Sequence, residues 1–317
     1  MEGYPAPGHA PDAETQKRAR RDFSRVGLSL LAMGAVTALV QLALALAAAR
    51  IWRETAPPGW LLWFVTFAPQ YLAAMPLAAW MLHRLVPANR PAQHSMGPGR
   101  FAAALLMCIG LMVTGSLLGS GLAEIFSGGA AENPLSAYVS RISALQVFVM
   151  VVLGPAAEEL LFRKLLLDRL ARYGGLPAAL VSGLCFGLYH MNLFQFFYAA
   201  ALGTLFAFLY LCTGRLRYPL ALHMLVNLLG SVVGPLLLQA AGGAGQTGLV
   251  LLAAYELLLL GAAVAGLVLL VRARRQFTFP PAACQLPAGG CRVAVLNAGM
   301  LLFAALCLGL TVFTLFA

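Results

Sequence analysis

The sequence predicts an all-α membrane protein, a polytopic transmembrane helix bundle with about eight or nine spans. Of its 317 residues, 61% are hydrophobic and only 10% are charged, so polar groups are too few to cover a water-facing surface. Nine apolar runs also approach the roughly 20 helical residues that cross a hydrocarbon core. They lie at 27–49, 60–82, 101–123, 143–167, 176–190, 194–212, 219–240, 247–271 and 293–316. The fifth run is short and charge interrupts the fourth, so a bundle of eight spans is the alternative.

The chain is expected to divide into four parts. The leader is polar and proline-containing, and the first apolar run is too long for a cleavable signal, so this run is interpreted as an anchor. The parts are a disordered basic cytoplasmic tail at 1–26, N-terminal transmembrane helices at 27–125, a transmembrane core at 143–240 and C-terminal transmembrane helices at 247–317.

The formal net charge of +10 lies mainly in the connections between apolar runs. A nucleic-acid binder gathers Lys and Arg on a folded soluble face, so this distribution excludes nucleic acid as the explanation. If all nine runs span, 18 basic residues fall on one side and three on the other, namely Arg50, Arg53 and Arg141. The positive-inside rule then predicts a cytoplasmic N-terminus and contact with anionic lipid. The Ala- and Leu-rich composition, with only two Lys among the 21 basic residues, suggests a bacterial source with a GC-rich genome. The expected location is therefore a bacterial cytoplasmic membrane.

The six cysteines predict no disulfide and no structural zinc site. Four lie inside apolar runs, where a thiol packs as a small hydrophobic group. Cys284 and Cys291 share one loop, but their spacing is not that of a zinc finger and the loop is expected to face a reducing cytoplasm. They are interpreted as an incidental pair.

The stretch GPAAEELLFRKLLLDRL places charges inside an apolar run. A charge near the bilayer centre costs roughly 2.5–3.5 kcal/mol, so a compensating interaction is needed. Glu159 and Arg163 are four residues apart and predict a neutralising pair, whereas Glu158 is rotated by about 100° and stays free. Pro155 is expected to kink the helix and open a cavity. The alternative is a snorkelling interfacial cluster with Lys164, Asp168 and Arg169.

The stretch SGLCFGLYH ends the short fifth run with a histidine. Gly183, Gly187 and His190 follow helical spacing with Phe186 on the same side, which predicts a smooth face suited to close helix packing. If the chain turns near Gly174, Glu158 and His190 are each 16 residues from the turn and face one another. The alternative for His190 is a satisfied core histidine.

The stretch PLALHMLVN places His223 and Asn227 one helical turn apart. Counting from the 213–218 loop predicts that His223 lies shallower than His190, unless that loop dips into a protein cavity within the membrane. The alternative is an interhelical hydrogen bond that holds the bundle together.

These groups together suit hydrolysis. A carboxylate can act as general base on water, a histidine can hold that water, and a second histidine with an amide can stabilise an oxyanion. A zinc ion held by Glu158, His190 and His223 is the other possibility that the donors permit. Neither HExxH nor GxSxG occurs in the chain, so the common soluble zinc-protease and serine-hydrolase patterns are absent.

The three stretches resemble the CPBP intramembrane proteases, which include CAAX prenyl endopeptidases and bacteriocin-processing and self-immunity proteins. The patterns are EExxxR, FxxxH and HxxxN, in family order, and the resemblance covers roughly 143–240. It implies that Glu158 and His190 activate a water, that Glu159 and Arg163 orient this group, and that His223 and Asn227 form the oxyanion site. The implied substrate is a prenylated or membrane-bound peptide; the resemblance decides neither for nor against zinc.

An apolar groove for a lipid tail is a further expectation. Phe194, Phe196, Phe197 and Tyr198 either line it or form an interfacial aromatic girdle.

Two other functional classes remain open. A non-catalytic scaffold or immunity protein could use the same fold, although it would gain nothing from costly buried charges. A proton-coupled transporter could use Glu256 as a relay, but a structural hydrogen bond to a neighbouring helix explains one isolated carboxylate equally well. The sequence gives neither the physiological substrate nor the oligomeric state.

Overall fold

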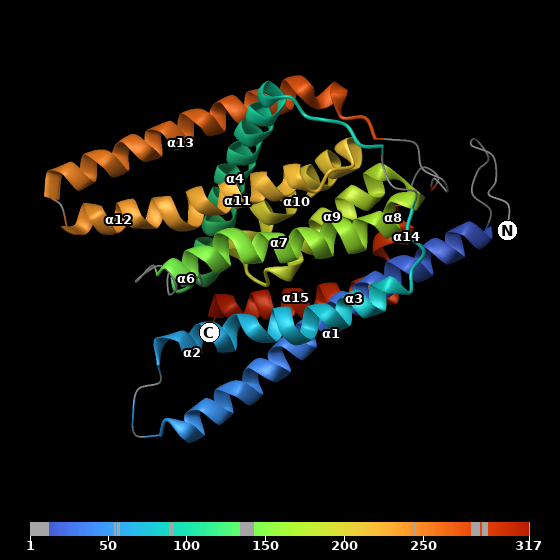
Figure 1. The fold of residues 1–317 in the computed structure, drawn as a ribbon, viewed down its shortest axis with the longest axis horizontal. Helices are drawn as coiled ribbons and strands as arrows, with labels where there is room; N and C mark the ends of the chain where they lie inside the picture. The colour runs from blue at the N-terminus through green and yellow to red at the C-terminus, as the bar shows by residue number, and fades with distance from the viewer. Residues whose placement is uncertain are drawn as a thin grey trace.

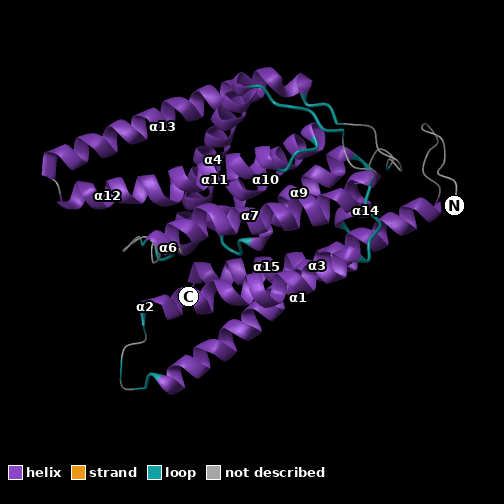
Figure 2. Cartoon of the chain, viewed as in Figure 1, coloured by secondary structure: helices purple, strands orange, loops and turns teal. Residues whose placement is uncertain are grey.

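The computed structural model describes residues 13–53, 55, 58–88, 92–133, 143–243, 245–279, 286 and 291–316. Within them the chain is entirely helical and contains no strand (Figure 2). Eight helices in these ranges are long and apolar enough to cross a membrane, and the helix at Gly175–Tyr189 is shorter. The predicted fold class is therefore confirmed, with eight long spans and a short fifth helix.

The helices form three groups in space (Figure 1). In the first, α1 (Ala13–Ile51) packs against α15 (Ala298–Phe316) and against the second span, which consists of α2 (Gly59–Ala68), the π-helical turn η1 (Pro69–Ala74) and α3 (Met75–His83). In the second, α4 (Pro98–Ser127) packs against α10 (Leu193–Thr213) and α13 (Gly245–Ala273).

The third group lies between the other two and carries the motifs. Its main element is the fourth span, composed of α6 (Ala144–Val147), η2 (Phe148–Leu153), α7 (Gly154–Glu159), η3 (Leu160–Leu167), α8 (Asp168–Leu170) and η4 (Ala171–Tyr173). Then follow α9 (Gly175–Tyr189) and, after α10, the span formed by α11 (Arg217–Leu228), η5 (Leu229–Val233) and α12 (Gly234–Gly243). The short pieces η6 (Arg274–Gln276) and α14 (Cys291–Val295) complete the described chain.

One expectation about the N-terminus is wrong. Residues 1–26 were predicted to be disordered, but α1 begins at Ala13, while 1–12 lie outside the described residues. The cause is tertiary packing, because the ring of Phe23 packs at a tilt against that of Tyr173, with centroids 5.8 Å apart. The hydroxyl of Tyr173 also donates a 2.6 Å hydrogen bond to the buried carboxylate of Asp22. These contacts continue the helix beyond the apolar run.

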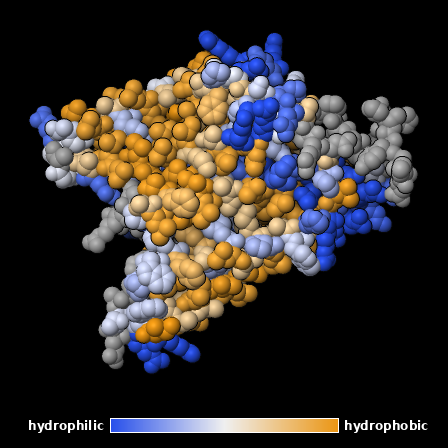
Figure 3. Space-filling model, viewed as in Figure 1, coloured by the Kyte–Doolittle hydropathy of each residue, from blue (hydrophilic) through white to orange (hydrophobic). Residues whose placement is uncertain are grey.

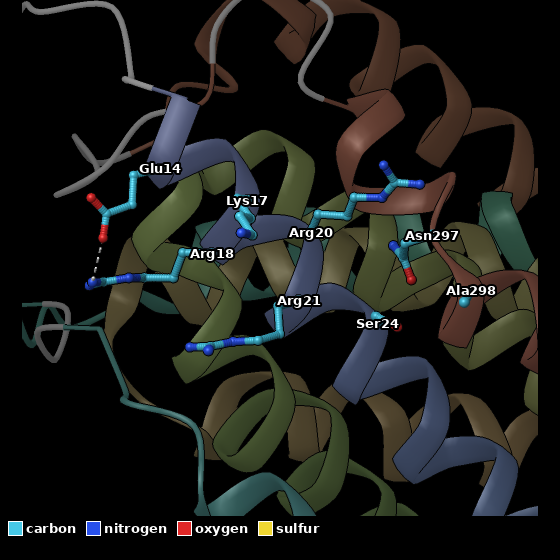
Figure 4. A pocket seen from close by; sticks show the side chains of 8 residues that line it. All are labelled: Glu14, Lys17, Arg18, Arg20, Arg21, Ser24, Asn297 and Ala298. Atoms are coloured by element: carbon cyan, nitrogen blue, oxygen red, sulfur yellow. Dashed lines mark ion pairs between the residues drawn. The ribbon is translucent and has the colours of Figure 1, made fainter.

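Hydrophilic side chains gather at the end of the molecule near the N-terminus, whereas the middle is hydrophobic (Figure 3). Backbone hydrogen bonds tie the connections at this end together, namely Ala88 to Asp168, His94 to Thr213 and Leu286 to Tyr173. Figure 4 shows part of this end, where a cavity of ≈ 690 Å³ is bordered by charged side chains of α1 and by Asn297 and Ala298. The connections that the positive-inside count placed on one side therefore do lie together.

The described cysteines are free thiols: Cys108, Cys185 and Cys307 are buried and Cys212 is partly buried. The expectation that Cys284 and Cys291 are an incidental pair lies outside the described residues, because the structure describes neither Cys284 nor the side chain of Cys291.

Candidate active site

A cavity of ≈ 350 Å³ lies inside the bundle, between the second span and the motif-bearing helices. Four of the six candidate residues line it, namely Glu158, His190, His223 and Asn227. The other two, Glu159 and Arg163, lie fully buried behind it. Three stretches that are up to 70 residues apart in sequence thus meet at one place.

The buried ion pair is formed as the spacing predicted. The guanidinium of Arg163 donates hydrogen bonds of 3.0 and 3.3 Å to the two carboxylate oxygens of Glu159. Its third hydrogen bond, of 2.9 Å, goes to the hydroxyl of Ser182 on α9, which itself is fully buried. Because both charges are paired and hydrogen-bonded, their burial is tolerated.

Aromatic rings surround the guanidinium of Arg163. Its central carbon lies 5.3 Å from the ring centroid of Phe186 and 5.8 Å from that of Phe206, a distance at which a cation is attracted to an aromatic ring. The same two rings contact His223, at centroid distances of 5.6 and 5.4 Å. Packing therefore fixes the ion pair and the imidazole as one unit.

His223 lies between the two carboxylates. Its Nδ1 is 3.1 Å from Oε1 of Glu159, a hydrogen bond in which the ring N–H is the donor. Its Nε2 is 3.6 Å from Oε2 of Glu158, which is too long for a direct hydrogen bond. The resemblance implied that Glu159 and Arg163 orient the Glu158–His190 group. In the structure they orient His223, a contact that local spacing could not reveal because the partners are 64 residues apart.

His190 presents one ring nitrogen to the cavity. Its Nδ1 lies 2.8 Å from the carbonyl oxygen of Phe186, and since a carbonyl only accepts, Nδ1 carries the proton in this contact. Nε2 of the neutral ring is then an acceptor. The ring of Phe186 stands edge-on to His190 at a centroid distance of 5.0 Å and edge-on to His223 at 5.6 Å.

The helix that bears His190 stops inside the bundle. After the 15 residues of α9 the chain turns through Met191, which has a φ of 53°. Asn192 satisfies the exposed backbone, because its side chain donates to the carbonyl of His190 at 2.8 Å and accepts from the N–H of Gln195 at 2.9 Å. Non-helical backbone is tolerated at this depth since it borders a cavity.

The small-residue face of α9 packs against α10. An added Cβ at Gly183 would lie 2.1 Å from Oγ1 of Thr204, and one at Gly187 would lie 2.7 Å from Cβ of Ala200. The close approach was predicted, and its partner is the following helix. This contact brings His190 to the edge of the cavity.

The depth conflict between His190 and His223 is resolved by the end of α10. The hydroxyl of Tyr210 donates to Asp168 and accepts from Lys164, both at 2.8 Å, so the last turn of α10 lies level with η3 and α8. The turn at Gly214 consequently lies deeper than the turn at Gly174. The loop between α10 and α11 is partly exposed, with Arg217 at the surface, so it is not enclosed in the protein as the depth argument required. His223 nevertheless lies beside Glu158, with Nε2 3.6 Å from Oε2.

Asn227 also contacts the fourth span. Its Nδ2 donates a 2.9 Å hydrogen bond to the carbonyl of Met150 in the π-helical turn η2. A primary amide has a second N–H and an oxygen, so the side chain keeps hydrogen-bonding capacity toward the cavity.

Three π-helical turns border the cavity, each beside a proline. Pro69 begins η1, Pro155 follows η2 and Pro235 follows η5. A proline supplies no N–H to the regular helical ladder, and a π turn accommodates one missing bond. Lining residues come from all three turns, which agrees with the expectation that Pro155 helps to open a cavity.

Several lining residues were not predicted. Thr66, Phe67, Gln70 and Tyr71 come from the second span, and Gln195 comes from the first turn of α10. An added Cβ at Gly154 would lie 3.2 Å from the hydroxyl of Tyr71, which therefore stands beside the turn that precedes Glu158. Gln70 and Tyr71 form a polar pair inside an otherwise apolar run, and this feature of the sequence could have indicated that the second span borders the cavity.

The aromatic expectation holds for one residue. Tyr198 lines the cavity and accepts a 2.9 Å hydrogen bond from Gln195, whereas Phe194, Phe196 and Phe197 are not among the lining residues.

The donor side chains are not grouped as a metal site requires. Among the described residues, no three His, Cys, Asp or Glu side chains form a group that could hold a metal ion. Glu158, His190 and His223 share the cavity without such an arrangement, so the residues as placed do not fit the zinc site that their types permitted.

Glu256 lies outside this cavity. It is exposed on α13, and it has no hydrogen bond or ion pair with any residue that the structure describes. Neither the relay nor the structural hydrogen bond considered for it is supported.

Comparisons with known proteins find similarity in the part of the chain that carries these residues. Residues 140–229 match the model of the type II CAAX prenyl endopeptidase Rce1-like family. The chain is also 31% identical over 106 residues to the Bacillus subtilis (strain 168) protein named "Putative membrane peptidase YdiL". That alignment covers 32% of this chain and 43% of the relative, so the chain spans less than half of the relative's length. No solved structure matches. The similarity to the type II CAAX prenyl endopeptidase Rce1-like family therefore covers residues 140–229, which is less than half of the chain.

Proposed function

We propose that this protein is an intramembrane endopeptidase whose catalytic core is residues 143–240. The observation that carries the proposal is the convergence of Glu158, His190 and His223 on one cavity within a membrane-spanning bundle. The match of the same segment to a peptidase family supports the reaction class. Buried charges of this cost are typical of functional sites in membranes.

Glu158 is the proposed general base. Its side chain is about one-fifth exposed, at 21%, whereas that of Glu159 is inaccessible, so Glu158 is the carboxylate that can reach a water molecule. Glu158 removes a proton from this water, and Nε2 of His190 accepts the second hydrogen bond and aligns it. The oxygen attacks the carbonyl carbon of the scissile peptide.

His223 and Asn227 are the proposed donors to the oxyanion of the tetrahedral intermediate. Glu159 accepts a hydrogen bond from Nδ1–H of His223, and Nε2 of the same ring is directed toward Glu158 and the cavity. Donation from Nε2 to the oxyanion requires a ring that carries a proton on both nitrogens. The intermediate collapses with cleavage of the C–N bond, and Glu158 returns its proton to the departing amine. Water is consumed and no other reactant is required.

The proposed substrate is a prenylated CAAX-type or membrane-bound peptide, in keeping with the family description. Such a substrate can arrive laterally through lipid while its scissile bond enters a wet cavity. The proposed setting is a bacterial cytoplasmic membrane with the N-terminus in the cytoplasm, supported by the bacterial relative and by the basic connections at one end.

The proposal is tested by comparing protein C-termini in membranes that carry the wild type, Glu158→Ala or His190→Ala at matched expression, together with cleavage of a prenylated CAAX peptide. New termini with the wild type alone support a protease and identify its substrates. Identical C-termini in all three samples, with the peptide left intact, would favour the non-catalytic scaffold or immunity protein.

A further inference from the structure

A second cavity, of ≈ 560 Å³, lies between α4, α10 and α13, outside the site described above. α4 and α10 each contribute one face with i, i+3, i+4, i+7 spacing, and α13 does so together with the turn η6 that continues it. The contributions are Arg100, Ala103, Ala104 and Met107 from α4, Leu205, Phe208, Leu209 and Cys212 from α10, Leu269, Arg272 and Ala273 from α13, and Gln276 from η6. Three regular helices therefore enclose one continuous space.

On both α4 and α13 the lining of this cavity is basic near the connections and becomes apolar toward the middle of the membrane. Near the connections stand Arg100 and Arg272, joined by His94 from the preceding loop. Further into the membrane the walls consist of alanine, methionine, leucine and phenylalanine side chains. A space that is cationic at the membrane surface and apolar below it matches an anionic amphiphile, with its head group at the surface and its tail in the interior.

The charge at the mouth is not balanced by acidic side chains. The lining contains no Asp or Glu, and no ion pair joins Arg100 or Arg272 to another residue that the structure describes. Basic pockets between transmembrane helices on the cytoplasmic side are suited to anionic lipid head groups.

The inner end of the cavity is closed by close helix packing. An added Cβ at Gly266 would lie 1.8 Å from the carbonyl oxygen of Leu106, and one at Gly110 would lie 3.0 Å from that of Ala263. At this level α4 and α13 touch through their backbones, and they separate toward the connections. The cavity occupies the space between them, so it is a feature of how the helices cross.

The two cavities use different parts of α10. Leu202 and Phe206 line the candidate active site, whereas Leu205 and Leu209 line the second cavity nearer the end of the helix. Much of the second cavity is built from helices outside residues 140–229, the family-matched segment.

We propose that this cavity binds one anionic glycerophospholipid, with the phosphate at Arg100 and Arg272 and an acyl chain against Ala103 and Phe208. The proposal does not depend on the proteolytic function. Membrane lipid is committed to as the occupant because the apolar walls lie within membrane-spanning helices and the cations lie at their ends.

The test measures lipid binding to the full-length protein, purified in mild detergent, by native mass spectrometry. Dioleoyl-phosphatidylglycerol, dioleoyl-phosphatidylcholine and inorganic phosphate are added separately and in competition. The expected result is one tightly bound phosphatidylglycerol, much weaker phosphatidylcholine and no displacement by phosphate. Displacement of the lipid by phosphate would overturn the proposal in favour of a small-anion site, and equal binding of both lipids would exclude recognition of charge.

Two substitutions test the contacts of the lipid head group and of the acyl chain separately. Arg272→Gln, at an exposed position, should weaken phosphatidylglycerol binding about fivefold, from about 1 kcal/mol per basic residue at an anionic surface. Ala103→Phe should fill the apolar part and weaken both lipids. Arg20→Gln is the matched control, since Arg20 lies at the same basic end but outside the cavity (Figure 4).

Equal losses with Arg20→Gln and Arg272→Gln would show general surface electrostatics and refute the site. Undiminished binding by Ala103→Phe would also refute it. If Ala103→Phe elutes as an aggregate, the comparison of Arg272→Gln with Arg20→Gln decides alone, because both positions are on the surface.

Discussion

Glu159 and His223 are 64 residues apart in sequence, yet Oε1 of the buried carboxylate accepts a 3.1 Å hydrogen bond from Nδ1 of the imidazole. Through this contact the ion pair of Glu159 with Arg163 fixes the ring that faces Glu158. The surroundings of two adjacent glutamates therefore differ: Glu159 is paired with Arg163 inside the protein, whereas Glu158 lines the cavity.

Removing the base is the most direct test of the proposed chemistry. Glu158→Gln keeps the shape of the side chain but cannot take a proton, so cleavage of a prenylated peptide should fall by about 10²–10⁴-fold with an unchanged unfolding temperature. Glu256→Gln is the matched control, because this glutamate is exposed on α13 and lies outside the cavity. Equal activity of Glu158→Gln and wild type would rule out the assigned base.

Removing the paired carboxylate should affect stability as well as activity. Glu159→Gln leaves the guanidinium of Arg163 buried without its counter-charge, which costs about 3–5 kcal/mol. A lower unfolding temperature in detergent should accompany the loss of cleavage. The double variant with Glu159→Met and Arg163→Met should recover much of the stability but none of the activity. An unfolding temperature of Glu159→Gln equal to that of the wild type contradicts the structural role.

The glycines of α9 should tolerate no side chain. A Cβ at Gly187 meets Cβ of Ala200 at 2.7 Å and the carbonyl oxygen of Phe196 at 2.8 Å. Gly187→Ala should therefore force α9 and α10 apart and lower the free energy of unfolding by about 1–3 kcal/mol. Gly261→Ala on α13 is the control, since nothing lies within 4 Å of its added Cβ. Matching thermal unfolding curves for the two variants would refute the close packing.

Metal removal distinguishes the two hydrolytic schemes that the residue types permit. The donors do not form a group suited to a metal ion, so dialysis against a zinc chelator should leave cleavage unchanged. Added zinc should not stimulate the dialysed protein. Loss of activity that zinc alone restores would instead assign Glu158, His190 and His223 as ligands.

The proposed orientation can be checked with reporter fusions in a bacterial host. A green fluorescent protein joined after Gln276 should fluoresce, because this end of α13 belongs to the basic side. Alkaline phosphatase joined after Gly129, beyond the other end of α4, should be active. The reverse pattern would place the N-terminus outside the cell.

Much of this fold was predictable because the membrane imposes a simple rule on sequence. Each span needs a long apolar run, and the observed helices follow the predicted runs closely. The residues at which the helices begin and end were less predictable. The helix at Ala13 extends into a polar segment because Asp22 and Phe23 find partners on η4, which no local pattern reveals.

That the candidate residues lie together was predictable from the sequence, but the contacts between them were not. Charge inside apolar runs identified Glu158, Glu159 and Arg163, and helical spacing paired the last two correctly. The partner of Glu159 in another span, the contact of Arg163 with Ser182 and the wall formed by the second span depend on how distant helices pack. Spacing along one helix carries no information about these contacts.

The residues of η1 that line the candidate active-site cavity bear on how the choice of peptide is encoded in the sequence. Gln70 and Tyr71 face the reacting groups, yet they lie outside residues 140–229, the segment that matches the peptidase family. On the proposed function, the groups that perform hydrolysis and part of the surface that admits a peptide belong to separate stretches of sequence. Exchange of residues 60–83 between relatives would therefore alter which peptides fit while keeping the chemistry, so a single hydrolytic centre can serve different substrates.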